Sequence, residues 1–189
     1  MRFLLLFFIG FITFPAFSAW QLDNQASALS FVTIKKGDVG EAHKFTRLEG
    51  SISDEGKVNF EIDLLSVHTN IEKRDERMRE FLFNTDMFPK ATFSAQLDMT
   101  LLNKIAAGKS ILMSFSGDIS LHGEKQVVNV QVLVAKLSDK QFIVSSLQPI
   151  ILNANSFALV AGVKKLQELA KLPSISNAVP VSFVLTFKR

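Results

Sequence analysis

The densest group of charged side chains in the sequence lies between positions 73 and 79. It contains Lys73, Arg74, Arg77 and Arg79, with Asp75 among them. Guanidinium groups bind anionic or carbonyl oxygens through paired hydrogen bonds, so Arg74 and Arg77 are candidates for contacting the head group of a ligand. The alternatives are a solvated helix face whose charges pair locally, or an Arg74 and Asp75 that lock a helix onto the rest of the fold.

The three histidines, His43, His68 and His122, do not have the spacing of a metal site. A metal-dependent hydrolase would require all three to converge. The sequence also contains no cysteine, no nucleophile elbow, no phosphate-binding glycine loop and no dinucleotide fingerprint. We therefore expect no catalytic residues and no metal ligands, and we do not expect an enzyme.

The first 19 residues have the pattern of a secretory signal peptide. Arg2 precedes an apolar run over residues 3–14, and small residues follow at Ala16, Ser18 and Ala19. The apolar run is shorter than the roughly 20 residues that span a bilayer. The pattern predicts export to the periplasm, with cleavage after Ser18 or after Ala19. The absence of cysteine excludes disulfides and a lipid-modified cysteine.

The remaining segment, residues 20–189, has the length of one domain. Arg2 is the one charged residue in the predicted signal peptide, so removing that segment lowers the formal net charge from +3 to +2. The basic residues do not form a continuous stripe along the chain. This charge pattern argues against a nucleic-acid partner.

Alternation of apolar and polar residues predicts that most of this domain is β-strand. Between positions 58 and 64, for example, Val58, Phe60, Ile62 and Leu64 alternate with polar residues. Strands are predicted at 28–35, 45–53, 58–64, 93–99, 111–121, 128–134, 141–153 and 181–187. Because most of them have one polar face, they predict a mainly β protein, an antiparallel barrel of about eight strands.

Two turn sequences join predicted strands. Asp54-Glu55-Gly56 and His122-Gly123-Glu124 each place a glycine where a tight connection needs positive φ. They predict antiparallel hairpins.

Two short helices are predicted between the strands. The first begins at Thr69, which has capping-box spacing to Glu72, and Asp75 and Arg79 are spaced to pair one turn apart. The second covers about 157–172 and has an apolar stripe on one side. This stripe either packs on the barrel wall or forms a lid over its mouth.

The stretch from Ser66 to Ser94 resembles the signature of the YceI family, and the segment Leu121–Val127 is similar to the strand-turn-strand segment of that family. The resemblance implies an extracytoplasmic, lipocalin-like barrel whose apolar interior holds a polyisoprenoid chain, such as an isoprenoid quinone or a polyprenyl lipid. The residues that fill the signature are Ser66, Thr69, Lys73, Arg74, Asp75, Phe81, Phe83, Phe88, Pro89, Ala91, Thr92, Phe93 and Ser94.

An eight-stranded barrel is either filled by its own side chains or wide enough for one small ligand. Of the 18 phenylalanines, 12 follow residue 19, and the chain has no tyrosine, which suits a hydrocarbon ligand. Burying an alkyl chain contributes about 0.8 kcal/mol per methylene. The predicted lining consists of Phe31, Phe45, Phe60, Ile62, Leu64, Phe93, Leu97, Met113, Phe115, Ile119, Phe183 and Leu185.

Arg74 and Arg77 would then bind a diphosphate or a quinone carbonyl at the barrel mouth. In the alternative interpretation, the apolar residues form a solid core and the outer surface binds a protein partner. The sequence leaves open whether the chain forms a homodimer.

Overall fold

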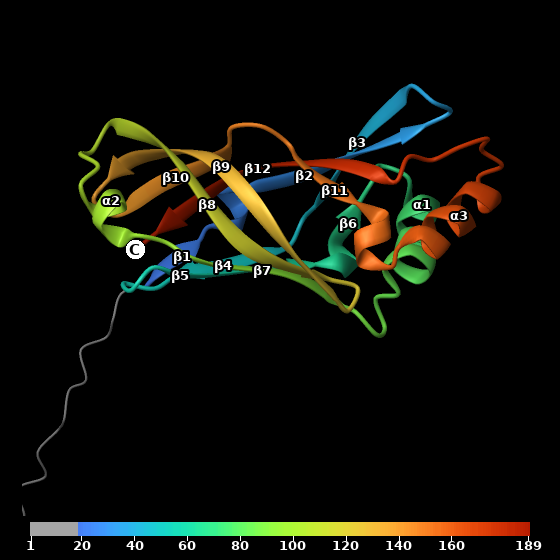
Figure 1. The fold of residues 1–189 in the computed structure, drawn as a ribbon, viewed down its shortest axis with the longest axis horizontal. Helices are drawn as coiled ribbons and strands as arrows, with labels where there is room; N and C mark the ends of the chain where they lie inside the picture. The colour runs from blue at the N-terminus through green and yellow to red at the C-terminus, as the bar shows by residue number, and fades with distance from the viewer. Residues whose placement is uncertain (1–18) are drawn as a thin grey trace, which may run out of the picture.

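The computed structural model describes residues 19–189 (Figure 1). The predicted signal peptide, residues 1–19, lies outside these described residues except for Ala19. The strands are β1 (Trp20–Leu22), β2 (Ala28–Lys35), β3 (Val39–Phe45), β4 (Leu48–Ile52), β5 (Lys57–Asp63), β6 (Val67–His68), β7 (Lys90–Gln96), β8 (Lys109–Leu121), β9 (Glu124–Ser138), β10 (Gln141–Ser146), β11 (Ile150–Asn153) and β12 (Ala178–Lys188).

Helical segments lie between the strands. The α-helices are α1 (Glu72–Arg77), α2 (Met99–Asn103) and α3 (Val160–Leu169). Helix α1 continues directly into the π-helix η3 (Met78–Phe83). Short 3₁₀ segments are η1 (Asn24–Ala26), η2 (Leu64–Ser66) and η4 (Ala154–Phe157).

The strands form one closed antiparallel barrel, which confirms the predicted fold class. Four pairs of consecutive strands, β1 with β2, β3 with β4, β5 with β6 and β10 with β11, each occupy one position in the wall. Strand β1 pairs with β4 on one side and with β12 on the other, and this second pairing closes the ring. Each of the eight positions therefore neighbours the next one along the chain, as in an up-and-down barrel.

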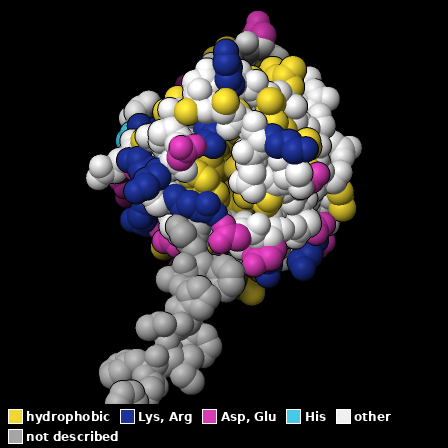
Figure 2. Space-filling view, turned by 90° about the vertical axis from the view of Figure 1, so that its left-hand side faces the viewer, with side chains coloured by type: hydrophobic (Ala, Val, Ile, Leu, Met, Phe, Trp, Pro, Cys, Tyr) yellow, Lys and Arg dark blue, Asp and Glu magenta, His cyan; other side chains and the backbone are white. Residues whose placement is uncertain are grey.

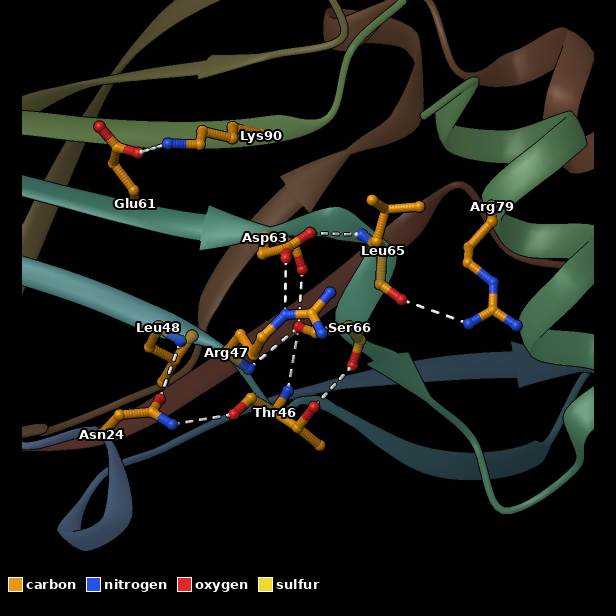
Figure 3. A network of polar contacts seen from close by, with 10 residues as sticks. All are labelled: Asn24, Thr46, Arg47, Leu48, Glu61, Asp63, Leu65, Ser66, Arg79 and Lys90. Atoms are coloured by element: carbon orange, nitrogen blue, oxygen red, sulfur yellow. Dashed lines mark hydrogen bonds and ion pairs between the residues drawn. The ribbon is translucent and has the colours of Figure 1, made fainter. Parts of the chain in front are cut away.

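In three neighbouring positions of the barrel wall, those of β1 and β2, β3 and β4, and β5 and β6, a short segment that is not β-strand separates the two strands. A polar network connects these segments, which together form an interruption of the wall (Figure 3). The Asn24 side chain donates to the Thr46 carbonyl at 3.0 Å and accepts from the Leu48 amide at 2.8 Å. The Ser66 hydroxyl oxygen accepts from the amides of Thr46 and Arg47 at 3.1 and 3.0 Å. The Thr46 amide also donates to the Ser66 carbonyl at 3.2 Å. The side chains of Asn24 and Ser66 thus supply hydrogen-bond partners to the main chain at the interruption, which lets the wall bend there without leaving these groups unsatisfied.

Several predicted boundaries were wrong. The predicted strand 45–53 starts at the interruption, because Phe45 ends β3. Strand β3 itself was not predicted from the sequence. The predicted strand 93–99 ends at Gln96, because the Asp98 side chain accepts a hydrogen bond from the Thr100 amide and caps α2. Helix α2 is thus an α-helix beyond the two that were predicted.

The two predicted hairpin turns are confirmed. His122 and Gly123 form a two-residue connection between β8 and β9, with φ of 52° and 84°. Two positive φ angles match the right-handed twist of paired strands. Gly56, with φ of 86°, lies in the turn between β4 and β5.

Helices cover both ends of the barrel (Figure 1). Helix α2 lies at one end, whereas α1, η3 and α3 lie together at the other. Gly162 allows α3 to pack closely on η3, because a Cβ atom there would lie 2.5 Å from the Phe81 carbonyl oxygen and 2.8 Å from the Leu82 Cα.

Replacing Gly117 with alanine should lower the free energy of unfolding by about 1–3 kcal/mol. A Cβ at this position in β8 would lie 2.3 Å from the Phe93 ring and 2.8 Å from the Ser94 carbonyl oxygen. Gly40→Ala is the matched control, because its Cβ would meet nothing closer than 3.8 Å. Urea denaturation should show Gly40→Ala within about 0.5 kcal/mol of wild type, and equal losses in both variants would contradict this packing.

Candidate binding cavity

The inner face of the barrel encloses a cavity of about 510 Å³. This volume lies within the range of small-molecule sites, which is roughly 300–1,000 Å³. All of the lining residues predicted from the sequence, from Phe31 to Leu185, lie on its wall. Their role as ligand contacts stays a prediction. Three further lining residues, Val130, Val132 and Val134, were not predicted, although the alternation within 128–134 places them on the inner face.

The helices complete the cavity wall at both ends. Leu102 of α2 lines it at one end, and Leu82 of η3 with Val163 and Leu166 of α3 line it at the other. Figure 2 looks onto the end that carries α2 and shows hydrophobic side chains in the middle of this face, surrounded by charged ones. At the opposite end, helix α3 covers the barrel and also contributes side chains to the cavity wall.

One part of the cavity wall changes from apolar to polar along β2 and β3. Alternate residues of a strand face the same side, and in this part of the wall Phe31 is opposite His43 and Thr33 is opposite Glu41. All four line the cavity, together with Lys35 at the end of β2. A ligand that fills the cavity would therefore meet hydrocarbon along most of its length and polar groups at this place.

Arg74 of α1 joins this polar wall. Its Nη1 lies 2.7 Å from Glu41 Oε2, and its Nη2 donates to the Thr69 carbonyl at 2.6 Å. Lys35 Nζ contacts the same Glu41 oxygen at 2.9 Å. The hydrogen bond from Lys35, and the positive charge of Arg74, lower the pKa of Glu41 below its ordinary value. The wall therefore holds an ionised carboxylate between two cations.

Both head-group candidates from the sequence line the cavity, but their surroundings differ. Arg74 is paired with Glu41, whereas Arg77 Nη1 donates to the Leu169 carbonyl at 3.4 Å. Glu41 and His43 were not predicted as a part of this site. Neither the alternation nor the charge spacing indicated that β3 would meet α1.

Two details predicted for the first helix are wrong. Thr69 does not cap it: α1 begins at Glu72 with Ile71 before it, and no side chain caps the first turn. Instead, the amide and the hydroxyl of Thr69 both donate hydrogen bonds to the carboxylate of Asp75, the amide at 2.9 Å. This carboxylate is buried. Arg79 pairs with Glu72 at 2.9 Å rather than with Asp75. A buried carboxylate needs hydrogen-bond donors, and Thr69 supplies them.

The three histidines do not converge. His43 lines the cavity, the Nδ1 of His68 lies 3.8 Å from Asp75 Oδ2, and the ring of His122 packs against Phe88 with centroids 4.5 Å apart. Within residues 19–189, no group of three or more His, Asp or Glu side chains is placed to hold a metal ion.

His43 is buried beside Phe31, whose ring centroid lies 5.3 Å away, and its Nε2 lies 2.9 Å from the Thr33 hydroxyl oxygen. Burial, and then the positive charge of Arg74, lower the pKa of His43 below its ordinary value of 6.5. The imidazole of the folded protein therefore stays neutral at pH values where an exposed histidine is partly charged.

The lowered pKa of His43 predicts a loss of stability as the pH falls below about 6.5. Below this value the unfolded chain binds the proton first, so the free energy of unfolding decreases until the folded imidazole also titrates. Chemical denaturation at pH 7.0 and 5.5 should show a smaller decrease for His43→Leu than for wild type. His122→Asn retains His43 and serves as the control. Equal decreases in the free energy of unfolding in all three proteins would contradict the conclusion that protonation of His43 causes the loss of stability.

One protein-family profile matches almost the whole of the described chain. The profile of the YceI-like domain matches residues 20–187, which run from β1 into the last residues of β12. The chain belongs to this family. A search of curated proteins gave no match.

Solved structures resemble this YceI-like chain. The structure of a polyisoprenoid binding domain from Saccharophagus degradans implicated in plant cell wall breakdown is 38% identical, with a TM-score of 0.87, and the match covers 89% of this chain and 97% of that one. BcnA from Burkholderia cenocepacia is 17% identical with a TM-score of 0.68, over 87% of this chain and 98% of BcnA, and shows a shared fold.

In this YceI-like chain, no helix within residues 19–189 is long and apolar enough to cross a membrane.

Proposed function

We propose that this protein binds a polyisoprenoid lipid in the barrel cavity and holds it for transport, storage or sequestration. The observation that carries this proposal is the cavity of about 510 Å³, whose wall is formed mainly by Phe, Leu, Ile, Val and Met. The 38% identical domain from Saccharophagus degradans, which is described as polyisoprenoid binding, supports the same ligand class. The cavity also argues against the solid-core alternative, in which the barrel would only present a surface to a protein partner.

The physical basis of binding is burial of hydrocarbon. Each methylene removed from water contributes about 0.8 kcal/mol, so a chain of several isoprene units binds tightly without many polar contacts. We also propose that binding takes place in the periplasm, because residues 1–19 have the pattern of a signal peptide. An exported carrier would keep such a chain out of water between membranes.

Binding can be tested with ligands that share a tail of four isoprene units. The purified protein, stripped of bound lipid, is incubated with geranylgeraniol or menaquinone-4, separated from free ligand by gel filtration and extracted with solvent. We expect one ligand per chain. Palmitic acid is tested in a parallel incubation. If the protein fraction contains neither geranylgeraniol nor menaquinone-4 but does contain palmitic acid, the result would contradict a polyisoprenoid carrier and favour a carrier of fatty acids.

A further inference from the structure

The outer surface of one half of the barrel wall carries no charge. It is formed by β8, β9, β10, β12 and β2, which are neighbours in the sheet. Because alternate residues of a strand face opposite sides, the residues between those that line the cavity point outward. None of these outward residues is charged within 28–34, 110–116, 129–137, 141–145 and 180–186. We call this surface the uncharged face. The chain as a whole has 21% charged residues, so composition alone does not explain it.

The opposite half of the wall, formed by β4, β5 and β7, is charged on its outer surface. Glu49 lies opposite Glu61 across β4 and β5, and Asp63 lies opposite Lys90 across β5 and β7. Figure 1 shows β9, β10 and β12 along the upper side of the barrel and β4, β5 and β7 along the lower side. The uncharged face is therefore one side of the molecule.

A row of mainly apolar side chains crosses the uncharged face. Leu112 of β8 lies opposite Leu133 of β9, which lies opposite Ser145 of β10. On the other side, Ser145 lies opposite Val184 of β12, and Val184 lies opposite Ala28 of β2. We call these five residues the apolar strip. Leu112, Leu133 and Val184 are 66%, 36% and 46% exposed. Contiguous exposed apolar residues mark interaction sites on soluble proteins.

The face is wide enough for a stable interface between proteins. Leu137 of β9, Leu147 at the end of β10 and Ile151 of β11 lie outside the strip and are at least half exposed. The Leu147 amide donates to the Gln131 carbonyl at 2.9 Å, which keeps this residue beside β9. The uncharged face has about 20 outward positions, which is close to the 20–30 residues that each partner contributes to a standard interface.

The polar residues of the face can pair with copies of themselves. In the row next to the apolar strip, Ser114 lies opposite Gln131, and Ser182 lies opposite Ser30. A hydroxyl or a side-chain amide both donates and accepts hydrogen bonds, whereas a charged side chain repels its own copy. A two-fold interface places the same surface on both sides. Neutral polar groups beside an apolar strip are therefore complementary to themselves.

Other kinds of partner fit the uncharged face less well. Nucleic acids and anionic membrane surfaces bind to clustered cations, and this face has none. A charged protein partner would find no group of opposite charge on it. A second copy of the chain needs no such group.

We infer that the uncharged face is the interface of a homodimer, in which β8, β9, β10 and β12 of two copies pack face to face with their apolar strips in contact. The interface lies on the side wall, whereas the helices lie at the two barrel ends (Figure 1). Dimer formation therefore leaves both ends of the cavity uncovered. It does not require the proposed ligand.

Sedimentation velocity of the mature chain tests this interface at protein concentrations from about 1 to 100 µM, because standard interfaces have dissociation constants from the micromolar range downward. We expect wild type to form dimers. Leu133→Lys should weaken dimer formation at least about a hundredfold, because each copy then brings a cation into the contact between the strips. Asn59→Lys is the matched control. It adds the same side chain at an exposed position of β5, on the charged half, and should stay within about twofold of wild type.

Cysteine cross-linking provides a second readout that does not depend on a charged variant. The chain contains no cysteine, so a single introduced thiol can react only with its own copy. Leu133 and Ser145 are adjacent in the middle of the apolar strip. A short bis-maleimide should convert at least one of Leu133→Cys and Ser145→Cys to a covalent dimer, whereas Asn59→Cys should stay monomeric on denaturing gels.

A wild type that remains monomeric up to about 100 µM would overturn the inference. So would a Leu133→Lys variant that dimerises as tightly as wild type, or cross-linking of Asn59→Cys alone, since the dimer would then use another surface. Monomeric wild type that floats with vesicles of phosphatidylethanolamine and phosphatidylglycerol would assign the face to a lipid surface instead. All of these outcomes are independent of ligand binding in the cavity.

Discussion

Replacing Asp75 with alanine is expected to destabilise the protein by about 3 kcal/mol, which corresponds to a decrease in melting temperature of about 10 °C. The Asp75 carboxylate is buried and accepts hydrogen bonds from the amide and the hydroxyl of Thr69, which is itself buried. Alanine leaves the buried Thr69 amide without a partner and leaves the Thr69 hydroxyl only the Ile71 carbonyl, 3.4 Å away. A buried donor without a partner costs about 1–3 kcal/mol, and the loss of the charged acceptor weakens the hydroxyl's hydrogen bond as well. The loss should also release α1, because Asp75 connects this helix to the segment that follows β6.

The matched variant is Asp75→Asn, which removes the charge and keeps an oxygen that accepts from Thr69. It should lose about 1–2 kcal/mol, because hydrogen bonds to a neutral acceptor are weaker than those to a carboxylate. Thermal unfolding of the three proteins at pH 7 provides the measurement. If Asp75→Ala were as stable as Asp75→Asn, Asp75 would not anchor the helix through Thr69.

Filling the cavity is expected to have the largest effect on binding. Met113 of β8 lines the cavity, and tryptophan at this position would occupy space that the ligand's tail needs. Displacing three or four methylenes from the interior costs about 3 kcal/mol, or roughly a hundredfold in affinity for menaquinone-4. The larger side chain enters existing space, so the free energy of unfolding should change less than the binding energy does.

Leu112→Trp is the control for this experiment. Leu112 precedes Met113 on the same strand but points outward, with 66% of its surface exposed. Tryptophan there adds the same ring to the outside of the barrel and should leave the dissociation constant within about twofold of wild type. Ligand titrations of both variants by native mass spectrometry would show the difference. Equal affinity in Met113→Trp and wild type would mean that the ligand binds elsewhere.

The parts of the fold that were predictable are strands with one apolar face. In β9, the inward residues Val130, Val132 and Val134 are buried, as their alternation with polar residues indicates. Strand β3 was missed because its inner face carries Glu41 and His43 and does not look apolar in the sequence. These residues face inward because Arg74 and Thr33 provide partners for them. The strand that the alternation missed is thus the polar wall of the candidate site.

The helix that carries the basic cluster shows a second limit. Thr69 and Glu72 have the spacing of a capping box, but the buried Asp75 takes the hydrogen bonds of Thr69. Arg74 was a candidate from its charge and from the family signature, yet its partner Glu41 lies 33 residues away in the sequence. Local patterns identify which side chains can do chemistry, whereas the pairing of distant segments decides which of them meet.

The most direct test of the central claim is native mass spectrometry of the mature protein purified from its own host, followed by solvent extraction of the same sample. The polyisoprenoid carrier described above predicts a stoichiometric mass excess that is extracted as a polyprenyl compound. A protein with the bare polypeptide mass, which stays bare after incubation with isoprenoid quinones and polyprenyl phosphates, would contradict the proposal that the cavity holds a polyisoprenoid lipid.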